Sequence, residues 1–212
     1  MFNQRATSYA APGKGPELRA LLEDRVKSLK SSGRVAAFGQ RMFGGPGGNG
    51  FVINIRYDNL AAAEAGRRQD QSNPAFQAYQ AKLGALVARP VDVELWEVLI
   101  PNPANPVMNA PFFVQRGLNY PAQGEAPEVR ALLEERVKTL QAEGMSATLG
   151  MGVYGTESPV FALQRSFQNL GQLDAVRARN QSDPAFQAYQ AKMGSLVRQP
   201  AQVQLGEVLI SM

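Results

Sequence analysis

A pattern of apolar residues at helical spacing occurs twice in the chain. The residues recur at steps of three and four, as Phe76, Tyr79, Leu83 and Leu86 and again as Phe186, Tyr189, Met193 and Leu196. Such spacing places the side chains on one face of an α-helix. Asn73 and Asp183 can cap these helices, and the following Pro74 and Pro184 suit a first helical position. We therefore predict two helices whose apolar stripes pack into a core.

The two helices belong to a longer duplication. QSNPAFQAYQAK at residues 71–82 returns as QSDPAFQAYQAK at residues 181–192, and PELRALLEDRVKSL from Pro16 returns as PEVRALLEERVKTL from Pro127. The closing EVLI also appears in both halves. A chain of 212 residues suits two modules of about 100 residues each. We predict a first module at residues 1–100, a proline-rich linker at 101–110 and a second module at 111–212.

Each half follows the order βαββαβ. In the first half the predicted elements are a strand at Phe2–Tyr9, a helix at Pro16–Leu29, strands at Val35–Phe43 and Phe51–Tyr57, a short helix at Asn59–Arg68, the repeated helix, and a strand at Val91–Ile100. This order is typical of the ferredoxin-like arrangement, an antiparallel sheet with both helices on one face. The predicted fold class is therefore α+β, with two tandem ferredoxin-like modules.

The closing strand of each half is apolar on both faces. Val93, Leu95 and Leu99 alternate with Trp96, Val98 and Ile100, so one set can face the helices while the other needs a second cover. We predict that the sheets of the two halves pack face to face. The result is a pseudo-dimeric α/β barrel formed within one chain.

Several short motifs resemble those of one known family. A Pro-Gly-Lys turn precedes the first helix, and the segments YDNL at 57–60, NPAFQAY at 73–79 and EVLIP at 97–101 follow in order. This combination resembles the NIPSNAP-like proteins of the dimeric α/β barrel superfamily, over nearly the whole chain. The resemblance implies the same barrel fold. It leaves the function open, because that superfamily includes haem-binding enzymes, cofactor-free oxygenases, isomerases and domains without known activity.

The composition narrows the chemistry. The chain has no histidine and no cysteine, which excludes the commonest general base, histidine and thiolate metal ligands, and a proximal histidine for haem. We expect no metal and no cofactor. Catalysis would then depend on carboxylates, tyrosine, lysine or arginine.

Charge and hydropathy restrict the partners. The net charge of +4 is scattered without a basic run, so we expect no nucleic-acid partner. No apolar run is long enough to span a membrane and the first residues do not resemble a secretion signal, so we expect a cytoplasmic protein without a membrane partner. Further homo-oligomerisation beyond the intramolecular pseudo-dimer stays open.

Two motifs have both a functional and a structural interpretation. Residues 45–50 fit the G-x-G-x-x-G pattern of dinucleotide sites, but they lie between two predicted strands, and that pattern requires a strand followed by a helix. A hairpin loop is favoured there. The Phe76 and Tyr79 pair could clamp a ligand, although aromatic residues at helical spacing more often pack in a core.

Three polar positions occur in both halves, on predicted strands. Arg5 aligns with Arg116, Tyr9 with Tyr120, and Glu97 with Glu207. The first and last strands of a ferredoxin-like sheet are neighbours, which would bring arginine and glutamate together. These six residues are our candidate ligand-binding set, lining a cavity beneath the helices. The alternative is a structural ion pair in each half.

These patterns leave three function classes. The first is a small-molecule binding protein with an apolar cavity in one or both halves, for a small hydrophobic ligand. The second is a metal-free, histidine-free oxygenase or isomerase for a hydrophobic or aromatic substrate, with Glu97 or Glu207 as base. The third is a structural or oligomerising module without catalysis. Because Trp96 corresponds to Gly206 and Arg41 to Gly152, we also expect the halves to differ in function.

Overall fold

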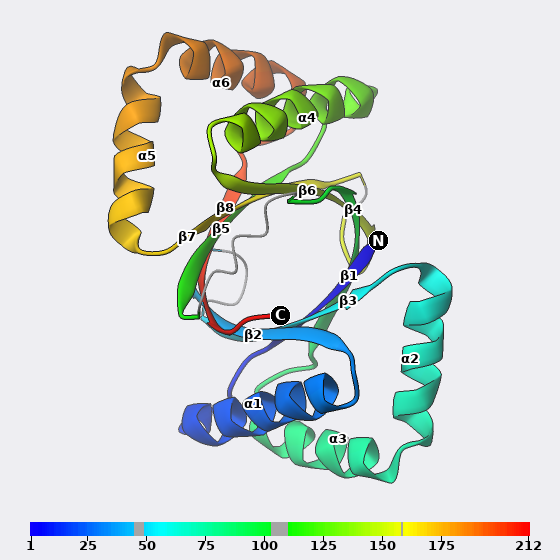
Figure 1. Ribbon diagram of the computed structural model, residues 1–212. Coiled ribbons are helices and arrows are strands. Elements are labelled where there is room, and N and C mark those ends of the chain that lie inside the picture. Colours follow the sequence, from blue (N-terminus) through cyan, green and yellow to red (C-terminus); the bar gives the residue numbers. More distant parts are fainter. Residues whose placement is uncertain (45–48, 103–109, 158) are drawn as a thin grey trace.

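The computed structural model describes residues 1–44, 49–102, 110–157 and 159–212. In these residues the chain forms a mixed α/β fold, with one closed antiparallel barrel and helices around it (Figure 1). The elements are β1 (Phe2–Ser8), α1 (Gly15–Ser31), β2 (Val35–Phe43), β3 (Gly50–Tyr57), α2 (Leu60–Ser72), α3 (Pro74–Leu86), β4 (Asp92–Ile100), β5 (Phe112–Asn119), α4 (Ala126–Ala142), β6 (Ser146–Tyr154), β7 (Phe161–Phe167), α5 (Leu170–Ser182), α6 (Pro184–Leu196) and β8 (Gln202–Ile210).

The strands follow each other around the barrel in the order β1-β3-β2-β8-β5-β7-β6-β4. The first half contributes β4-β1-β3-β2 and the second contributes β8-β5-β7-β6, so each half supplies four adjacent strands in the same internal order. Two seams join the halves, where β2 pairs with β8 and β4 pairs with β6. The predicted pairing of the first and last strands is present as β1 with β4.

The expected face-to-face packing of two sheets is wrong in its geometry. The halves meet at their strand edges, and backbone hydrogen bonds continue across both seams. The physical reason is that each half alone would leave two edges with unpaired N–H and C=O groups, which pairing between the halves satisfies. The inner faces of the sheet therefore curve around an interior instead of pressing against each other.

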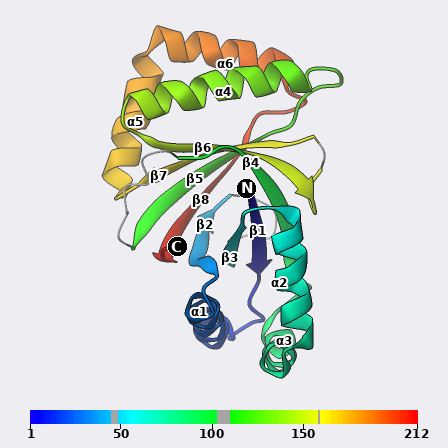
Figure 2. The ribbon, with the colours of Figure 1, turned by 45° about the vertical axis from the view of Figure 1, so that its right-hand side comes forward.

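The two larger apolar cores lie outside the barrel, beneath the helices. α1 buries Leu18, Leu22, Val26 and Leu29 against the outer face of the first half, and α4 buries the equivalent Val129, Leu133, Val137 and Leu140. Figure 2 shows α4 and α6 on one side of the barrel, with α1 and α3 on the opposite side. Because these helices account for the outer faces of the sheet, the inner faces are left for a site.

The capped helices form as the sequence predicts. The Asn73 side chain accepts a hydrogen bond from the Ala75 N–H at 2.9 Å, and Asp183 accepts one from Ala185 at 2.9 Å. The stripe of α3 is only half-buried. Its Tyr79, Leu83 and Leu86 pack at the margin of the first core.

Two predictions concern residues outside the described part of the chain. Positions 45–48 of the glycine-rich motif and positions 103–109 of the predicted linker lie outside the described residues. The elements on either side of the glycine-rich motif are β2 and β3, as a hairpin requires and a dinucleotide site does not. Among the described residues, no helix is both long and apolar enough to cross a membrane.

Candidate functional site

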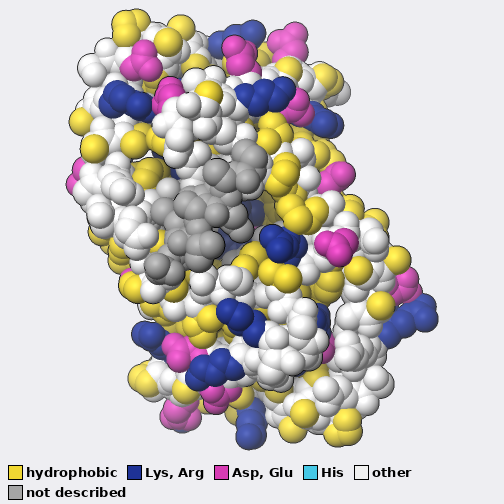
Figure 3. Space-filling model, viewed as in Figure 1, with side chains coloured by type: hydrophobic (Ala, Val, Ile, Leu, Met, Phe, Trp, Pro, Cys, Tyr) yellow, Lys and Arg dark blue, Asp and Glu magenta, His cyan; other side chains and the backbone are white. Residues whose placement is uncertain are grey.

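The interior of the barrel contains a cavity of 370 Å³. Every strand of the barrel contributes to its wall, so the cavity belongs to the whole chain and not to one half. Met1 and Met212, at the two chain ends, also line it. The space-filling view shows a hollow between the two helical layers, with hydrophobic side chains and a Lys or Arg side chain at its edge (Figure 3). The sequence led us to expect cavities beneath the helices; the cavity instead lies on the opposite face of the sheet.

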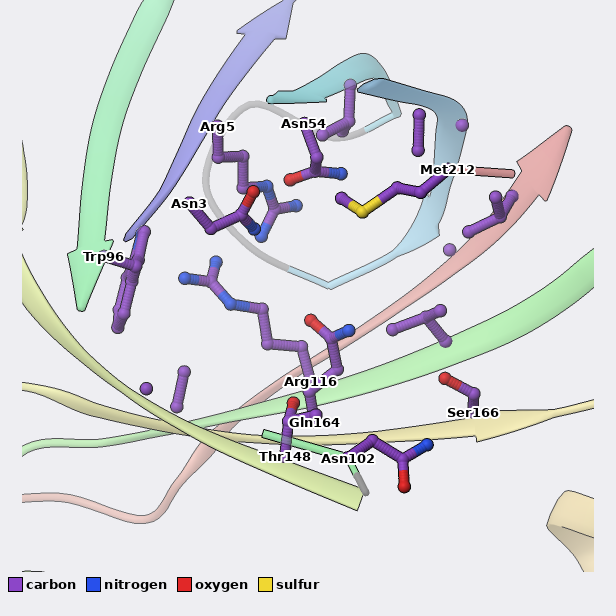
Figure 4. A pocket seen from close by; sticks show the side chains of 18 of the residues that line it. Asn3, Arg5, Asn54, Trp96, Asn102, Arg116, Thr148, Gln164, Ser166 and Met212 are labelled. Carbon is purple, nitrogen blue, oxygen red and sulfur yellow. The ribbon is translucent and has the colours of Figure 1, made fainter. Parts of the chain in front are cut away.

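Strand alternation decides which side chains reach this cavity. Asn3 and Arg5 of β1 point inward, and β3 places Asn54 directly across from Arg5. On β5 and β7 the inward residues include Arg116 and its cross-strand partner Gln164. Figure 4 shows the side chains of Arg5 and Arg116 projecting toward each other from opposite walls. The inner surface therefore combines amides and guanidiniums with small apolar residues.

Arg116 is held in a buried cluster with Trp96 and Glu94. Its Nη1 and Nη2 each lie 3.4 Å from Oε2 of Glu94, and its guanidinium carbon lies 4.0 Å from the Trp96 ring centroid. Trp96 Nε1 donates to the same Glu94 oxygen at 2.9 Å. Burial, together with the nearby charge of Arg5, lowers the pKa of Arg116 to about 9, although Glu94 acts in the opposite direction. Arg116 is still a cation at neutral pH.

Arg5 is less completely paired. Its Nη1 donates to Oε1 of Gln204 at 3.1 Å, while its Nε is buried without a hydrogen-bond partner among the described residues. Oδ1 of Asn3, on the same strand and facing the same cavity, is also buried without a partner in the described part of the chain. Burial lowers the pKa of Arg5. Unpaired buried polar groups of this kind are uncommon in proteins and call for an explanation.

The two arginines are equivalent positions that reach across the barrel. Along the backbone, β1 pairs Arg5 with Glu94, and β5 pairs Arg116 with Gln204, the equivalent position in the second half. The side chains exchange these partners, because Arg5 bonds Gln204 and Arg116 bonds Glu94. Each guanidinium is thus held by a residue of the other half.

A second cavity of 140 Å³ lies next to the main one, behind the side chains of Arg5 and Gln204. Arg5, Arg41, Trp96 and Gln204 line both cavities and so separate them. In this region Arg41 donates to the hydroxyl of Tyr9 at 2.7 Å, and both residues are buried. Tyr120 lines the same small cavity.

The six predicted site residues are therefore divided among three places. Arg5 and Arg116 line the main cavity, and Tyr9 and Tyr120 line the second one. Glu97 lies between the inward-facing Trp96 and Val98, so alternation directs its side chain to the outer face of β4. Glu207 borders the cavity, but its neighbours Gly206 and Val208 face inward, which directs its carboxylate outward.

The expected pairing of Arg5 with Glu97 is wrong. The residue across from Arg5 is Glu94, whereas Glu97 lies across from Phe2. Sequence reasoning missed Glu94, Asn3, Asn54, Gln164 and Gln204. A signal was available, since alternation along VDVELWEVLI places Glu94 on the same face as Trp96, and alternation from Arg5 selects Asn3.

No metal centre is evident among the described residues. Residues 1–44, 49–102, 110–157 and 159–212 contain no group of three or more acidic, histidine or cysteine side chains that could hold an ion. The cluster of charged groups inside the barrel is made of arginines with one carboxylate, which suits an anion and not a cation.

The comparisons with known proteins identify the fold. No family model matches the chain, and no curated protein matches it. Among solved structures, a putative monooxygenase from Fusobacterium nucleatum is similar with a TM-score of 0.71 at 14% identity, covering 100% of this chain and 92% of that one. The chain has the same fold as this structure, which is of the dimeric α/β barrel type.

Two further solved structures match the chain over nearly its whole length. An anthrone oxidase-like protein has a TM-score of 0.66 at 13% identity, covering 98% of this chain and 90% of that one. A putative monooxygenase from Lactobacillus acidophilus has a TM-score of 0.65 at 10% identity, covering 98% and 92%. Identities this low establish the architecture alone. The functional argument therefore rests on the residues inside the barrel.

Proposed function

We propose that this protein binds a small organic molecule in the interior of its barrel, with one site per chain. The observation that carries the proposal is the 370 Å³ cavity with Arg5 Nε and Asn3 Oδ1 buried in its wall and unpaired among the described residues. The volume lies within the usual range of small-molecule sites, about 300–1,000 Å³. A purely structural module would be expected to close this space and pair its arginines.

The proposal differs from the sequence-based one in the number of sites. A cavity within each half would bind two molecules per chain, whereas a cavity bounded by all strands binds one. The halves are not equivalent around it. Trp96 contributes an aromatic wall on one side, and Gly206 stands at the corresponding position on the other. A single asymmetric site is consistent with halves that have specialised.

The origin of this arrangement is also part of the proposal. The identical strand order of the halves and the repeated sequences support two tandem ferredoxin-like modules, at residues 1–100 and 111–212. A closer relation to NIPSNAP-like proteins rests on the short motifs alone. Neither point is needed for the binding proposal, because the cavity is described directly by its lining residues.

A cavity-filling variant tests the proposal. Val114 lines the cavity on β5, so Val114→Phe should fill part of it and abolish binding while the chain still folds. The probes are benzoate, octanoate and their neutral amides, whose binding is titrated by calorimetry. Native mass spectrometry of the protein as purified detects any co-purified molecule. We expect at least one probe or a co-purified molecule to bind at one per chain.

The matched control is Val153→Phe, because Val153 is 45% exposed on β6. It should bind as the unmodified protein does. The proposal is wrong if no probe binds and nothing co-purifies, or if Val114→Phe binds as well as the control.

A second candidate function is that of a metal-free oxygenase. It is favoured by the fold shared with the two putative monooxygenases and by guanidiniums that could stabilise an enolate. The reaction would convert an activated methylene and O2 to a ketone and water, after a base accepts the first proton. Glu97 and Glu207 face outward, so the carboxylate proposed for this step is Glu94, which borders the second cavity. Oxygen uptake with dithranol as the probe, lost in Val114→Phe, would support it.

A further inference from the structure

The charges inside the barrel do not balance between the halves. Arg5 and Arg116 are equivalent cations, but the residues that receive them are not equivalent, because Glu94 in the first half corresponds to Gln204 in the second. Glu94 is engaged by both Arg116 and Trp96. Arg5 is left with a neutral amide acceptor. Two guanidiniums thus share one carboxylate.

Other acidic residues nearby do not restore the balance. Asp92 borders the second cavity, but it pairs with Arg89 at 2.8 Å. Glu157 borders the same cavity and pairs with Arg198 at 3.5 Å. Glu97 and Glu207 are directed to the outer face of the sheet by alternation. The excess positive charge therefore remains at Arg5 and Arg116, and the buried Arg41, which donates to Tyr9, adds a third cation to the wall between the two cavities.

Burial makes this excess costly for the protein alone. Arg116 is only 7% exposed, and burial with the Arg5 charge lowers its pKa to about 9. Arg5 in addition has its Nε unpaired among the described residues. Buried guanidiniums without a full set of hydrogen-bond and charge partners are destabilising. Their presence indicates that a bound ligand supplies the missing partners.

The geometry of the Arg5 and Arg116 side chains indicates which chemical group of a ligand binds between them. From the pairing above and the view in Figure 4, we propose that the cavity selects a monoanionic carboxylic acid whose carboxylate lies between Arg5 and Arg116; this deepens the proposed function and rests on it. Guanidiniums are planar forks that match the two oxygens of a carboxylate. Asn3 and Asn54 add amide groups to the same wall. Arg5 and Arg116 have one carboxylate between them, so one further negative charge would give each of these two guanidiniums its own partner, which favours a carboxylate over a phosphate dianion.

The remaining wall indicates the body of the ligand. Valine side chains from four strands line the cavity around the polar cluster: Val52, Val98, Val114 and Val208. Met212 also reaches into the cavity (Figure 4). An apolar aliphatic or aromatic group attached to the carboxylate would bury its surface against these residues. The ligand class is therefore an apolar monocarboxylic acid.

The chain provides its own reporter for this binding. Trp96 is its only tryptophan, and its ring stacks on Arg116 in the cavity wall. Titration of the full chain with benzoate and octanoate should change Trp96 fluorescence and raise the melting temperature. The neutral benzamide and octanamide should bind about tenfold or more weakly, because they cannot satisfy the excess charge.

The sharpest variant restores the missing charge within the protein. Gln204→Glu is nearly isosteric, and it would give Arg5 its own carboxylate. We expect this variant to have a higher melting temperature without ligand and to lose the preference for acids over amides. Arg5→Met should lose that preference as well. Gln190→Glu, the same change at an exposed position on α6, is the control and should behave as the unmodified protein.

The outcomes separate this inference from the proposed function. If amides bind as tightly as acids and Gln204→Glu leaves both unchanged, the carboxylate assignment is wrong while the binding site stands. Tighter binding of phenyl phosphate than of benzoate would also overturn it. If neither acids nor amides bind, and nothing co-purifies with the protein, both proposals fail together.

Discussion

Asp70 is the single carboxylate on which a charged network in the first half depends. It accepts hydrogen bonds from Arg25 at 2.8 Å and from Arg34 at 2.9 Å, and its side chain is only 16% exposed. Arg34 also donates to the Tyr57 hydroxyl at 2.7 Å. In the second half Asn180 and Phe167 stand at the positions of Asp70 and Tyr57, so Arg136 donates there to a neutral amide instead of a carboxylate. The halves thus differ on their outer faces as well as inside the barrel.

Replacing Asp70 should therefore be costly. Asp70→Asn leaves two largely buried arginines without a counter-charge, and we expect the free energy of unfolding to fall by about 2 kcal/mol. Urea unfolding of the full chain measures this. Asp24→Asn removes an exposed pair with Lys27 and should change stability by less than about 0.5 kcal/mol. Equal effects of the two variants would contradict the prediction.

Single residues were also where prediction from sequence was weakest. The repeat drew attention to Arg5 and Arg116, which line the cavity, but the choice of Glu97 over Glu94 as their partner depended on strand register. A shift of register by one residue moves a side chain to the opposite face of the sheet. Neither composition nor repetition specifies that register. Only the pairing of β1 with β4 places Glu94 across from Arg5.

At the scale of elements, the third and sixth helices bury aromatic rings beneath arginines. In α3, Phe76 and Tyr79 stack with ring centroids 5.8 Å apart, and the guanidinium carbon of Arg25 lies 4.7 Å from the Phe76 centroid. α6 repeats this with Phe186, Tyr189 and Arg136. The rings therefore contact arginines of α1 and α4, far from the barrel cavity, and do not act as a ligand clamp there. Burial raises the pKa of both Tyr79 and Tyr189 to about 12.

This shift predicts how alkaline pH affects stability. An unfolded tyrosine loses its proton near pH 10, whereas Tyr79 in the folded state keeps its proton to about pH 12. The folded state thus binds more protons over this interval, and stability falls as pH rises, by up to about 1.4 kcal/mol per pH unit for each such group. Tyr79→Phe should reduce this slope above pH 10 and leave it unchanged below pH 9.

Urea unfolding at a series of pH values measures the slope. Tyr154→Phe is the matched control, because Tyr154 is 70% exposed. Comparing variants with the unmodified chain cancels the opposite contribution of Arg116, whose lowered pKa makes stability rise with pH above about 9. A Tyr79→Phe slope identical to that of the control would show that the ring is not buried as described.

Elements were predicted well because their signals are local. Capping by Asn73 with Pro74 fixed the start of α3, and β2 has the bounds read from Val35–Phe43. α2 runs to Ser72, beyond the predicted end at Arg68, because no helix-breaking residue occurs until the cap of the next helix. Cap and breaker residues act within one turn, so sequence alone is sufficient to find them.

At the scale of the whole molecule, the seams between the halves have their own sequence requirements. Gly44 follows β2 and Gly155 follows β6, both with positive φ, at equivalent places in the two halves. A Cβ at Gly44 would lie 2.0 Å from the Val203 carbonyl oxygen, and one at Gly155 would lie 2.0 Å from that of Val93. Only glycine permits this approach of strand to strand. Pairing at both seams therefore depends on glycine at equivalent positions of the two halves.

Closure of the barrel was the feature that sequence could not specify. Both faces of β4 are apolar, which correctly indicated that each sheet needs a second cover on its inner side. The same pattern suits two stacked sheets or a single closed one. The choice between them depends on whether the edge strands β2, β4, β6 and β8 pair with each other. In the sequence, the seam glycines Gly44 and Gly155 look the same as turn glycines such as Gly13 and Gly33, so they do not reveal this pairing. The central cavity follows from that closure, so it could not be located in advance.

The seams predict how an isolated half would behave. Residues 1–102 alone would expose the edges of β2 and β4, together with the inward-facing Arg5 and Trp96. Because the strand order is the same in both halves, two copies can pair these edges with each other and rebuild a barrel. We expect this fragment to form a homodimer or to aggregate, and to assemble with residues 110–212 when the two are produced together. Analytical ultracentrifugation gives the assembly state, and a fragment that unfolds cooperatively as a soluble monomer would show that the seams do not hold the halves together.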